Sequence, residues 1–126
     1  MINWFSQVSE STVTISNVSI TLNKEASKNF SDAIYVKLGY SEEKNMIYIK
    51  KVTKDEIDSY LDESLLNSLF HLTVAKTYAR ITSKPFIDYL VKELKILDFN
   101  GQKQLKFNCV YNTLEATLEV SIKGGQ

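Results

Sequence analysis

The chain has 126 residues, of which 44% are hydrophobic, and it carries 15 basic and 15 acidic side chains. This length supports a single domain over residues 1–126 with one hydrophobic core, and the hydrophobic content excludes a disordered protein. The single Cys109 excludes an internal disulfide, and no apolar run is long enough to cross a bilayer. We therefore expect a cytoplasmic protein without membrane association.

The charges are divided unevenly along the chain. Residues 1–63 carry seven Lys and ten acids, a net charge of −3, and residues 64–126 carry seven Lys, one Arg and five acids, a net charge of +3. Complementary halves favour self-association, although ordinary scatter gives similar counts. The single Arg80 argues against a dedicated phosphate or base reader, because such sites favour the bidentate Arg fork.

The first predicted elements are two short strands and a helix. The β-branched run from Thr12 is broken at Ser16-Asn17, which predicts two strands within residues 12–22. Asn23 is a suitable N-cap because its side chain can accept a backbone N–H. A short helix over residues 24–30 should follow it.

A hairpin is predicted next, over residues 34–49. Apolar side chains alternate on both strands, and the even length of the polar turn at residues 42–45 keeps both apolar sets on one face. The opposite face carries aromatic and basic side chains, which are Tyr35, Lys37, Tyr48 and Lys50.

The middle of the chain predicts a central helix. Thr53 and Glu56 match a capping box, and apolar residues at helical spacing continue to Phe70, so we expect a helix over about residues 54–71. Residues 73–82 contain enough β-branched side chains for a strand, with a continued helix as the alternative.

The last predicted elements are a helix and a second hairpin. Ser83 is a suitable N-cap, and Pro85 fits the first turn of a helix. Asn100-Gly101 should end that segment in a turn. Apolar side chains then alternate on two strands over residues 105–122, around a turn at residues 112–115.

The chain therefore contains the same pattern twice, with the caps Asn23 and Ser83 60 residues apart. We predict an α+β fold of two strand–helix–hairpin pseudo-repeats, over residues 12–52 and 73–123, with a central helix and a mostly antiparallel sheet. Chance recurrence of common α+β patterning is the alternative. The expected core contains Ile20, Leu22, Phe30, Val36, Leu38, Ile47, Ile49, Leu65, Phe86, Leu90, Phe107, Cys109 and Val120.

No residues form a recognisable catalytic site. His71 is the only histidine and has no neighbouring nucleophile or orienting carboxylate, so we interpret it as a partly buried structural residue. Cys109 alternates with Phe107 and Tyr111, which indicates an inert core thiol. One His and one Cys cannot assemble a zinc site. We predict no enzymatic activity, no cofactor and no metal.

An acidic cluster runs from Asp55 to Glu63, with Asp55, Asp58 and Asp62 along one face of the predicted helix. Paired carboxylates can bind a hard cation. A solvated acidic face near a helix N-terminus, stabilised by the helix dipole, explains the same residues. We therefore assign the cluster no site.

The polar face of the first hairpin is the best candidate binding surface. Tyrosines beside lysines on an open sheet can stack bases while the ammonium groups contact phosphates. Tyr is also an ordinary strand residue that packs against a helix or a second subunit. With two lysines of the first helix, the candidate binding residues are Lys24, Lys28, Tyr35, Lys37, Tyr48 and Lys50.

Residues 13–51 resemble the AbrB/SpoVT-type swapped-hairpin family. The matching segments are Val13-Thr-Ile-Ser16, Ile20-Thr-Leu-Asn-Lys-Glu25, Val36-Lys-Leu38 and Met46-Ile-Tyr-Ile49. A second copy from Ala79 is similar to MraZ-type proteins, which carry two such units in one chain. The family's Gly-Arg before the Ile-x-Leu step is missing, its Pro is Asn23 and its helix Arg is Ser27. The chain also resembles small uncharacterised bacterial and phage-type proteins, a resemblance that carries no function.

The resemblance implies an oligomeric, nucleic-acid-associated protein. We accordingly predict a non-catalytic binding protein of the AbrB-like kind. The alternative is a small protein-binding accessory or inhibitor factor of a mobile element that binds no nucleic acid, which the zero net charge favours. We also predict a homodimer, because the apolar Trp4 and Phe5, the two equivalent hairpins and the complementary charges all favour self-association.

Overall fold

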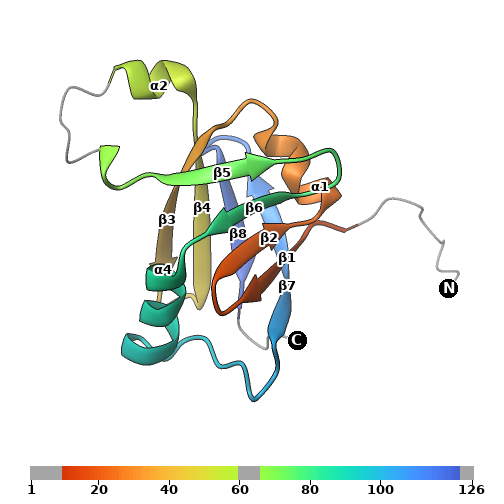
Figure 1. Ribbon diagram of the computed structural model, residues 1–126, viewed down its shortest axis with the longest axis vertical. Coiled ribbons are helices and arrows are strands. Elements are labelled where there is room, and N and C mark those ends of the chain that lie inside the picture. The colour runs from red at the N-terminus through yellow and green to blue at the C-terminus, as the bar shows by residue number, and fades with distance from the viewer. Residues whose placement is uncertain (1–9, 60–65, 123–126) are drawn as a thin grey trace, which may run out of the picture.

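The computed structural model describes residues 10–59 and 66–122, and their main elements are β-strands (Figure 1). The strands are β1 (Thr12–Ser16), β2 (Ser19–Leu22), β3 (Tyr35–Ser41), β4 (Met46–Val52), β5 (Phe70–Val74), β6 (Ala79–Thr82), β7 (Gln104–Asn112) and β8 (Thr117–Ser121). The helices are α1 (Lys24–Ser27), which continues as a 3₁₀ turn, η1 (Lys28–Phe30), then α2 (Lys54–Asp58), and α4 (Lys84–Asp88), which continues as a π-helical turn, η2 (Tyr89–Glu93).

The strands form a closed barrel in the order β1-β2-β6-β5-β3-β4-β8-β7. Every neighbouring pair is antiparallel, including β7 with β1, which closes the ring. The sequence of strand, strand, helix, strand, strand occurs twice along the chain, first from β1 to β4 and then from β5 to β8. In the ring, the hairpins of these two units alternate, so each hairpin has hairpins of the other unit on both sides.

The predicted helix N-caps and the predicted capping box are present in the structure. The Asn23 side chain accepts a hydrogen bond from the Ala26 N–H at 3.0 Å, and Ser83 caps α4, whose first turn contains Pro85. Thr53 and Glu56 form the reciprocal capping box of α2. These side chains satisfy N–H groups that the first turn of a helix leaves unpaired, which is why the helices begin where they do.

The second hairpin of each unit, β3–β4 in the first and β7–β8 in the second, has the same kind of turn. Each has a four-residue turn, and the last residue of each turn, Asn45 before β4 and Ala116 before β8, has a left-handed backbone, with φ of 53° and 52°. Residues with positive φ are mostly Gly, Asn or Asp. Asn45 suits this conformation, and Ala116 adopts it against its intrinsic preference.

Inward-facing side chains from all eight strands and from the helices form the core. Leu38 and Phe86 are half-buried and pack against it, and Leu65 lies outside the described residues. The other predicted core residues are confirmed as buried, namely Ile20, Leu22, Phe30, Val36, Ile47, Ile49, Leu90, Phe107, Cys109 and Val120.

The predicted α+β fold with a central helix is wrong. The structure is a closed antiparallel barrel with short helices; α2 ends at Asp58, and β5 begins at Phe70. Phe70 and His71 pair with Val36 and Tyr35, so barrel closure outweighs the helical spacing of the preceding apolar residues. Residues 60–65 of the predicted helix lie outside the described part of the chain.

The strand alternative for residues 73–82 is the correct one. This stretch contains the end of β5, a turn and β6, and the turn includes a 2.8 Å hydrogen bond from the Ala75 N–H to the Tyr78 carbonyl. Across the described ranges, none of the helices combines the length and the apolarity that crossing a membrane requires.

Exchanging the residues at the two equivalent turn positions tests the equivalence of the hairpins. Ala116→Asn should raise the free energy of unfolding by about 0.5–1 kcal/mol, because Asn tolerates positive φ better than Ala, and Asn45→Ala should lower it by a similar amount. Urea denaturation measures both. Leu114→Asn is the control in the same turn, at an exposed position without positive φ, and should change the free energy by less than about 0.5 kcal/mol. A stabilising Asn45→Ala would contradict the assignment.

Candidate functional site

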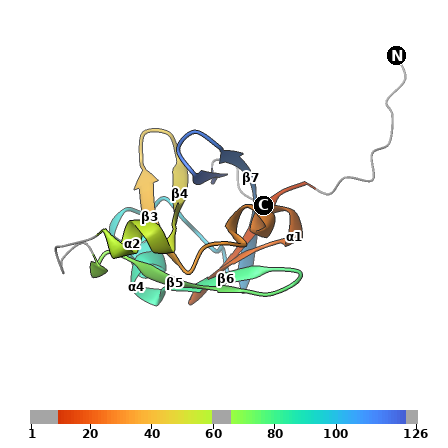
Figure 2. The same cartoon turned by 90° about the horizontal axis from the view of Figure 1, so that it is seen from above.

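The structure separates the six predicted binding residues into two groups. Tyr35, Lys37, Tyr48 and Lys50 are half-buried and lie on the outside of β3 and β4, as their alternation with buried residues predicted. Lys24 and Lys28 belong to α1 and η1, and α1 packs against β1, β2 and β7. Figure 2 shows α1 on the other side of the barrel from β3 and β4, so the six residues do not form one surface.

We call the outer surface of β3, β4, β8 and the end of β7 the tyrosine–lysine face. It consists of two cross-strand rows. In register order from β3 to β7, the first row is Lys37, Lys50, Thr117 and Asn112, and the second row is Gly39, Tyr48, Glu119 and Val110. A shallow pocket of about 300 Å³ lies here, lined in part by Lys37, Tyr48, Lys50 and Glu119.

The tyrosine–lysine face carries charges of both signs. The Lys50 ammonium donates a 2.9 Å hydrogen bond to the carbonyl oxygen of Glu115. The Asn112 amide donates to a carboxylate oxygen of Glu119 at 3.2 Å. Carboxylates beside the lysines would repel a phosphate backbone, so this face suits a protein or a mixed-charge partner better than a nucleic acid.

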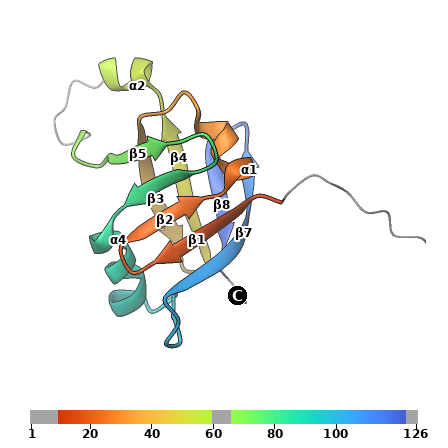
Figure 3. The same cartoon turned by 45° about the vertical axis from the view of Figure 1, so that its right-hand side comes forward.

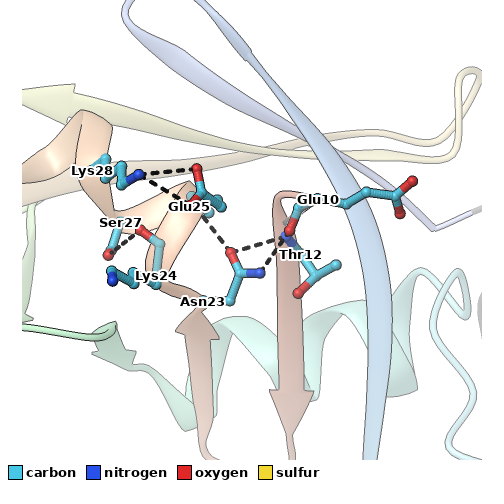
Figure 4. Close-up of polar contacts among 8 residues, drawn as sticks. Glu10, Thr12, Asn23, Lys24, Glu25, Ser27 and Lys28 are labelled. Carbon is cyan, nitrogen blue, oxygen red and sulfur yellow. Dashed lines mark hydrogen bonds and ion pairs between the residues drawn. The ribbon is translucent and has the colours of Figure 1, made fainter. Parts of the chain in front are cut away.

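The two lysines of the first helix lie apart from the tyrosine–lysine face. The Lys28 ammonium lies 3.1 Å and 3.2 Å from the two carboxylate oxygens of Glu25, so its charge is paired within one helical turn (Figure 4). Lys24 is exposed at the start of α1. The register Leu22 with Ala79 brings the start of α1 next to the turn between β5 and β6.

The opposite side of the barrel carries a surface that the sequence analysis missed, which we call the hydroxyl face. Figure 3 shows its strands side by side in the order β5, β6, β2, β1 and β7. Its outward-facing residues alternate with buried core residues and are mostly Ser and Thr. They are Thr14, Ser16, Ser19, Thr21, His71, Thr73, Arg80, Thr82, Gln104, Lys106 and Asn108.

One row crosses all five strands of the hydroxyl face. Lys106 is opposite Thr14, and Thr14 is opposite Thr21. Thr21 is opposite Arg80, and Arg80 is opposite Thr73. Three interstrand steps of roughly 4.8 Å separate Lys106 from Arg80, so the backbones of the two residues lie about 14 Å apart, with Thr14 and Thr21 between them.

Arg80 is oriented by its neighbours on this face. Its Nε donates a 3.4 Å hydrogen bond to the Thr21 hydroxyl, and its guanidinium carbon lies 5.1 Å from the centre of the Tyr78 ring. A cation held over an aromatic ring loses less conformational freedom when it binds an anion. The lone Arg, which the sequence analysis treated as evidence against a phosphate site, is therefore the best-positioned cation of this face.

None of the hydroxyl-face residues is an acid. Glu10, just before β1, lines a pocket with Asn108 at the end of this face. The carboxylates of Asp55, Glu56 and Asp58 belong to α2, and those of Glu42 and Glu43 belong to the turn between β3 and β4. No sequence motif signals this face, because five separate strands supply its residues.

His71 and Cys109 have different environments. The prediction that His71 is partly buried is wrong, because its side chain is exposed on β5 and makes an edge contact with Tyr35, with ring centres 5.8 Å apart. Cys109 is buried as predicted, and its burial raises the pKa of the thiol to about 12. A thiol that stays protonated at neutral pH is a poor nucleophile.

The acidic cluster is only partly described, because Asp62 and Glu63 lie outside the described residues. Asp55 and Asp58 are exposed, and Glu56 accepts hydrogen bonds in the capping box. Within residues 10–59 and 66–122, no three His, Cys, Asp or Glu side chains are placed to hold a metal ion.

Comparison of the chain with protein-family models, curated proteins and solved structures found no match. The resemblance to AbrB/SpoVT-type proteins therefore stays a prediction from the residues quoted above.

The Asn23 side chain links the start of α1 to the start of β1 by hydrogen bonds. Its side-chain oxygen accepts from the N–H groups of Ala26 at 3.0 Å and Thr12 at 3.2 Å, and its amide donates to the Glu10 carbonyl at 2.8 Å (Figure 4). The residue thus caps α1 and also fixes the start of β1.

Removing these bonds should cost more than removing an ordinary cap. We expect Asn23→Ala to lower the free energy of unfolding by about 2 kcal/mol or slightly more, because the N–H groups of Ala26 and Thr12 lose a partner together. Ser83→Ala, the matched cap of the second unit, should cost about 1 kcal/mol. Urea denaturation measures both, and equal losses would show that the bonds to Thr12 and Glu10 contribute nothing.

Proposed function

We propose that the protein is a non-catalytic nucleic-acid-binding protein and that the hydroxyl face contacts the sugar–phosphate backbone. The observation that carries this proposal is the row from Lys106 to Thr73, which places two cations and three hydroxyl groups side by side and contains no carboxylate. The resemblance to AbrB/SpoVT-type proteins supports the same class of ligand. A cytoplasmic location is part of the proposal.

The chemistry of the hydroxyl face suits backbone contacts more than base recognition. Half or more of the hydrogen bonds in protein–DNA complexes go to phosphate and sugar, and Arg, Lys, Ser and Thr are among their donors. The strands are fixed on both sides by pairing, so these donors keep their relative positions. Reading base edges in the major groove requires an element that enters the groove, such as a helix or a two-stranded ribbon. A broad sheet surface cannot enter it, so we expect little sequence preference.

The small number of cations sets the expected strength of binding. Arg80 and Lys106 lie on the face, and Lys24 and Lys76 lie beside it, near and within the turn between β5 and β6. Contact with two or three phosphates gives a salt slope of roughly −1.8 to −2.7 for duplex DNA. Between about 50 and 200 mM salt the affinity should therefore fall roughly ten- to fortyfold.

Fluorescence anisotropy with a mixed-sequence duplex and a mixed-sequence single strand, at both salt concentrations, tests the proposal. Arg80→Ala and Lys106→Ala should each weaken binding and reduce the salt slope by about one. The matched control is Lys50→Ala on the tyrosine–lysine face, which should leave the affinity unchanged. The proposal fails if neither nucleic acid binds below about 100 μM at low salt, where non-specific binders register.

A protein-binding function is the second candidate, and the tyrosine–lysine face favours it. This face combines Tyr48 with charges of both signs and with Val110, an apolar side chain that is 69% exposed. The adjoining turn between β7 and β8 carries Leu114, which is 98% exposed. Interfaces are enriched in Tyr and place apolar groups inside a polar rim. Loss of nucleic-acid binding in Lys37→Ala or Lys50→Ala, with Arg80→Ala unaffected, would instead move the nucleic-acid site to this face.

A further inference from the structure

The tyrosine–lysine face has its charges sorted across the strands. Lys37 on β3 and Lys50 on β4 lie on one side. Glu119 on β8 and Glu115 in the turn before β8 lie on the other side. The apolar residues are sorted as well, because the second row begins with Gly39 on β3 and ends with Val110 on β7. The boundary between the two halves runs between β4 and β8.

The tyrosine–lysine faces of two copies have complementary charges when they are related by one particular two-fold rotation. A two-fold axis that lies in the contact plane, parallel to the strands and between β4 and β8, places the β3–β4 side of one copy over the β8–β7 side of the other. Lysines then face the acidic side of the second copy. An axis perpendicular to the strands would instead place lysines over lysines, which is unfavourable.

The shapes agree with the charges. Under the same rotation, Val110 of one copy lies over Gly39 of the other, because both belong to the same row and lie at equal distances from the axis. A Cβ added at Gly39 would meet only the Tyr48 Cβ within 4 Å, at 4.0 Å, so the space above this glycine is open. Val110 is 69% exposed, which is unusual for an apolar strand residue.

We propose that a second copy of this chain binds the tyrosine–lysine face and forms a two-fold symmetric dimer. In this dimer Val110 fills the space above Gly39, and Glu119 lies over Tyr48, within reach of Lys50 of the other copy. Sheets that pack face to face stay within about 30° of alignment, which preserves these pairings. The hydroxyl-face row from Thr14 to Thr73 lies on β1, β2, β6 and β5, which are outside this contact, so this inference is independent of the proposed nucleic-acid binding.

The predicted affinity is modest. One chain supplies all eight strands of the closed barrel, so the sheet is complete without a second chain. The contact covers part of four strands, and small interfaces give weak or transient association. The dimer should therefore form at concentrations of tens to hundreds of micromolar, which corresponds to roughly 5–6 kcal/mol of binding free energy.

Sedimentation equilibrium on the full chain, over a range up to about 500 μM, tests the dimer. The wild-type mass should rise from 14.4 kDa towards twice that value. Lys50→Glu and Glu119→Lys should each stay monomeric, because each places like charges across the contact. A mixture of the two variants should form dimers again, because both contacts between positions 50 and 119 in the mixed dimer join opposite signs.

Two further variants separate the interface from effects on folding. Val110→Lys should abolish the dimer without loss of circular dichroism signal, because the side chain is already largely exposed. Lys106→Glu on the hydroxyl face is the matched control and should dimerise like the wild type. A wild-type chain that stays monomeric over the whole range, or a mixture of Lys50→Glu and Glu119→Lys that stays monomeric, would overturn the proposal.

Discussion

The alternation of hairpins around the barrel is the constraint on which the rest of this structure depends. A β-hairpin has two outer edges whose N–H and C=O groups need partners. Here both edges of every hairpin are paired with hairpins of the other unit, so neither unit can satisfy its edges alone. Closure of the ring pairs all of these edges together, and the apolar side chains that it encloses form one core.

Closure also determines both candidate surfaces. Once the inward side of each strand is fixed by the core, the alternate residues must point outward. The register then assembles each surface from segments that are distant in sequence, such as Lys106 with Thr14, and Glu119 with Tyr48. Because the ring is closed, the hydroxyl face and the tyrosine–lysine face cover different strands and meet only at β7 and at the contact between His71 and Tyr35. One molecule can therefore use both at once.

Much of the local structure could be predicted from sequence because it depends on neighbouring residues. Asn23 and Ser83 as caps, the capping box at Thr53, and the alternation in the first hairpin each need only a few adjacent positions. The secondary structure of Phe70 could not be predicted from its neighbours in sequence. Its helical spacing is a local signal, whereas its place in β5 depends on pairing with Val36, which is 34 positions earlier in the chain.

The candidate site was predictable only in part, for a related reason. Tyr48 and Lys50 could be placed on one face because both belong to one hairpin. Arg80 could not be placed, because the 60-residue repeat aligns it with Ile20, which is buried, whereas Arg80 is exposed. The repeat is therefore one of element order and not of side-chain orientation in β2 and β6. Only the strand register reveals the row that joins Arg80 to Lys106.

Native-state hydrogen exchange, followed at increasing urea concentration, tests the interleaving of the two units most directly. Three amides that join the units are informative: Leu72 donates to the Ile34 carbonyl at 2.8 Å, Ser83 donates to the Val18 carbonyl at 2.9 Å, and Lys51 donates to the Ala116 carbonyl at 2.9 Å. If the units are interlocked, these three amides should have the same free energy of opening as the amides within β1–β4 and within β5–β8. That free energy should equal the free energy of global unfolding. If the amides of β1–β4 and those of β5–β8 instead open as two groups with different free energies, the units unfold separately and the account is contradicted.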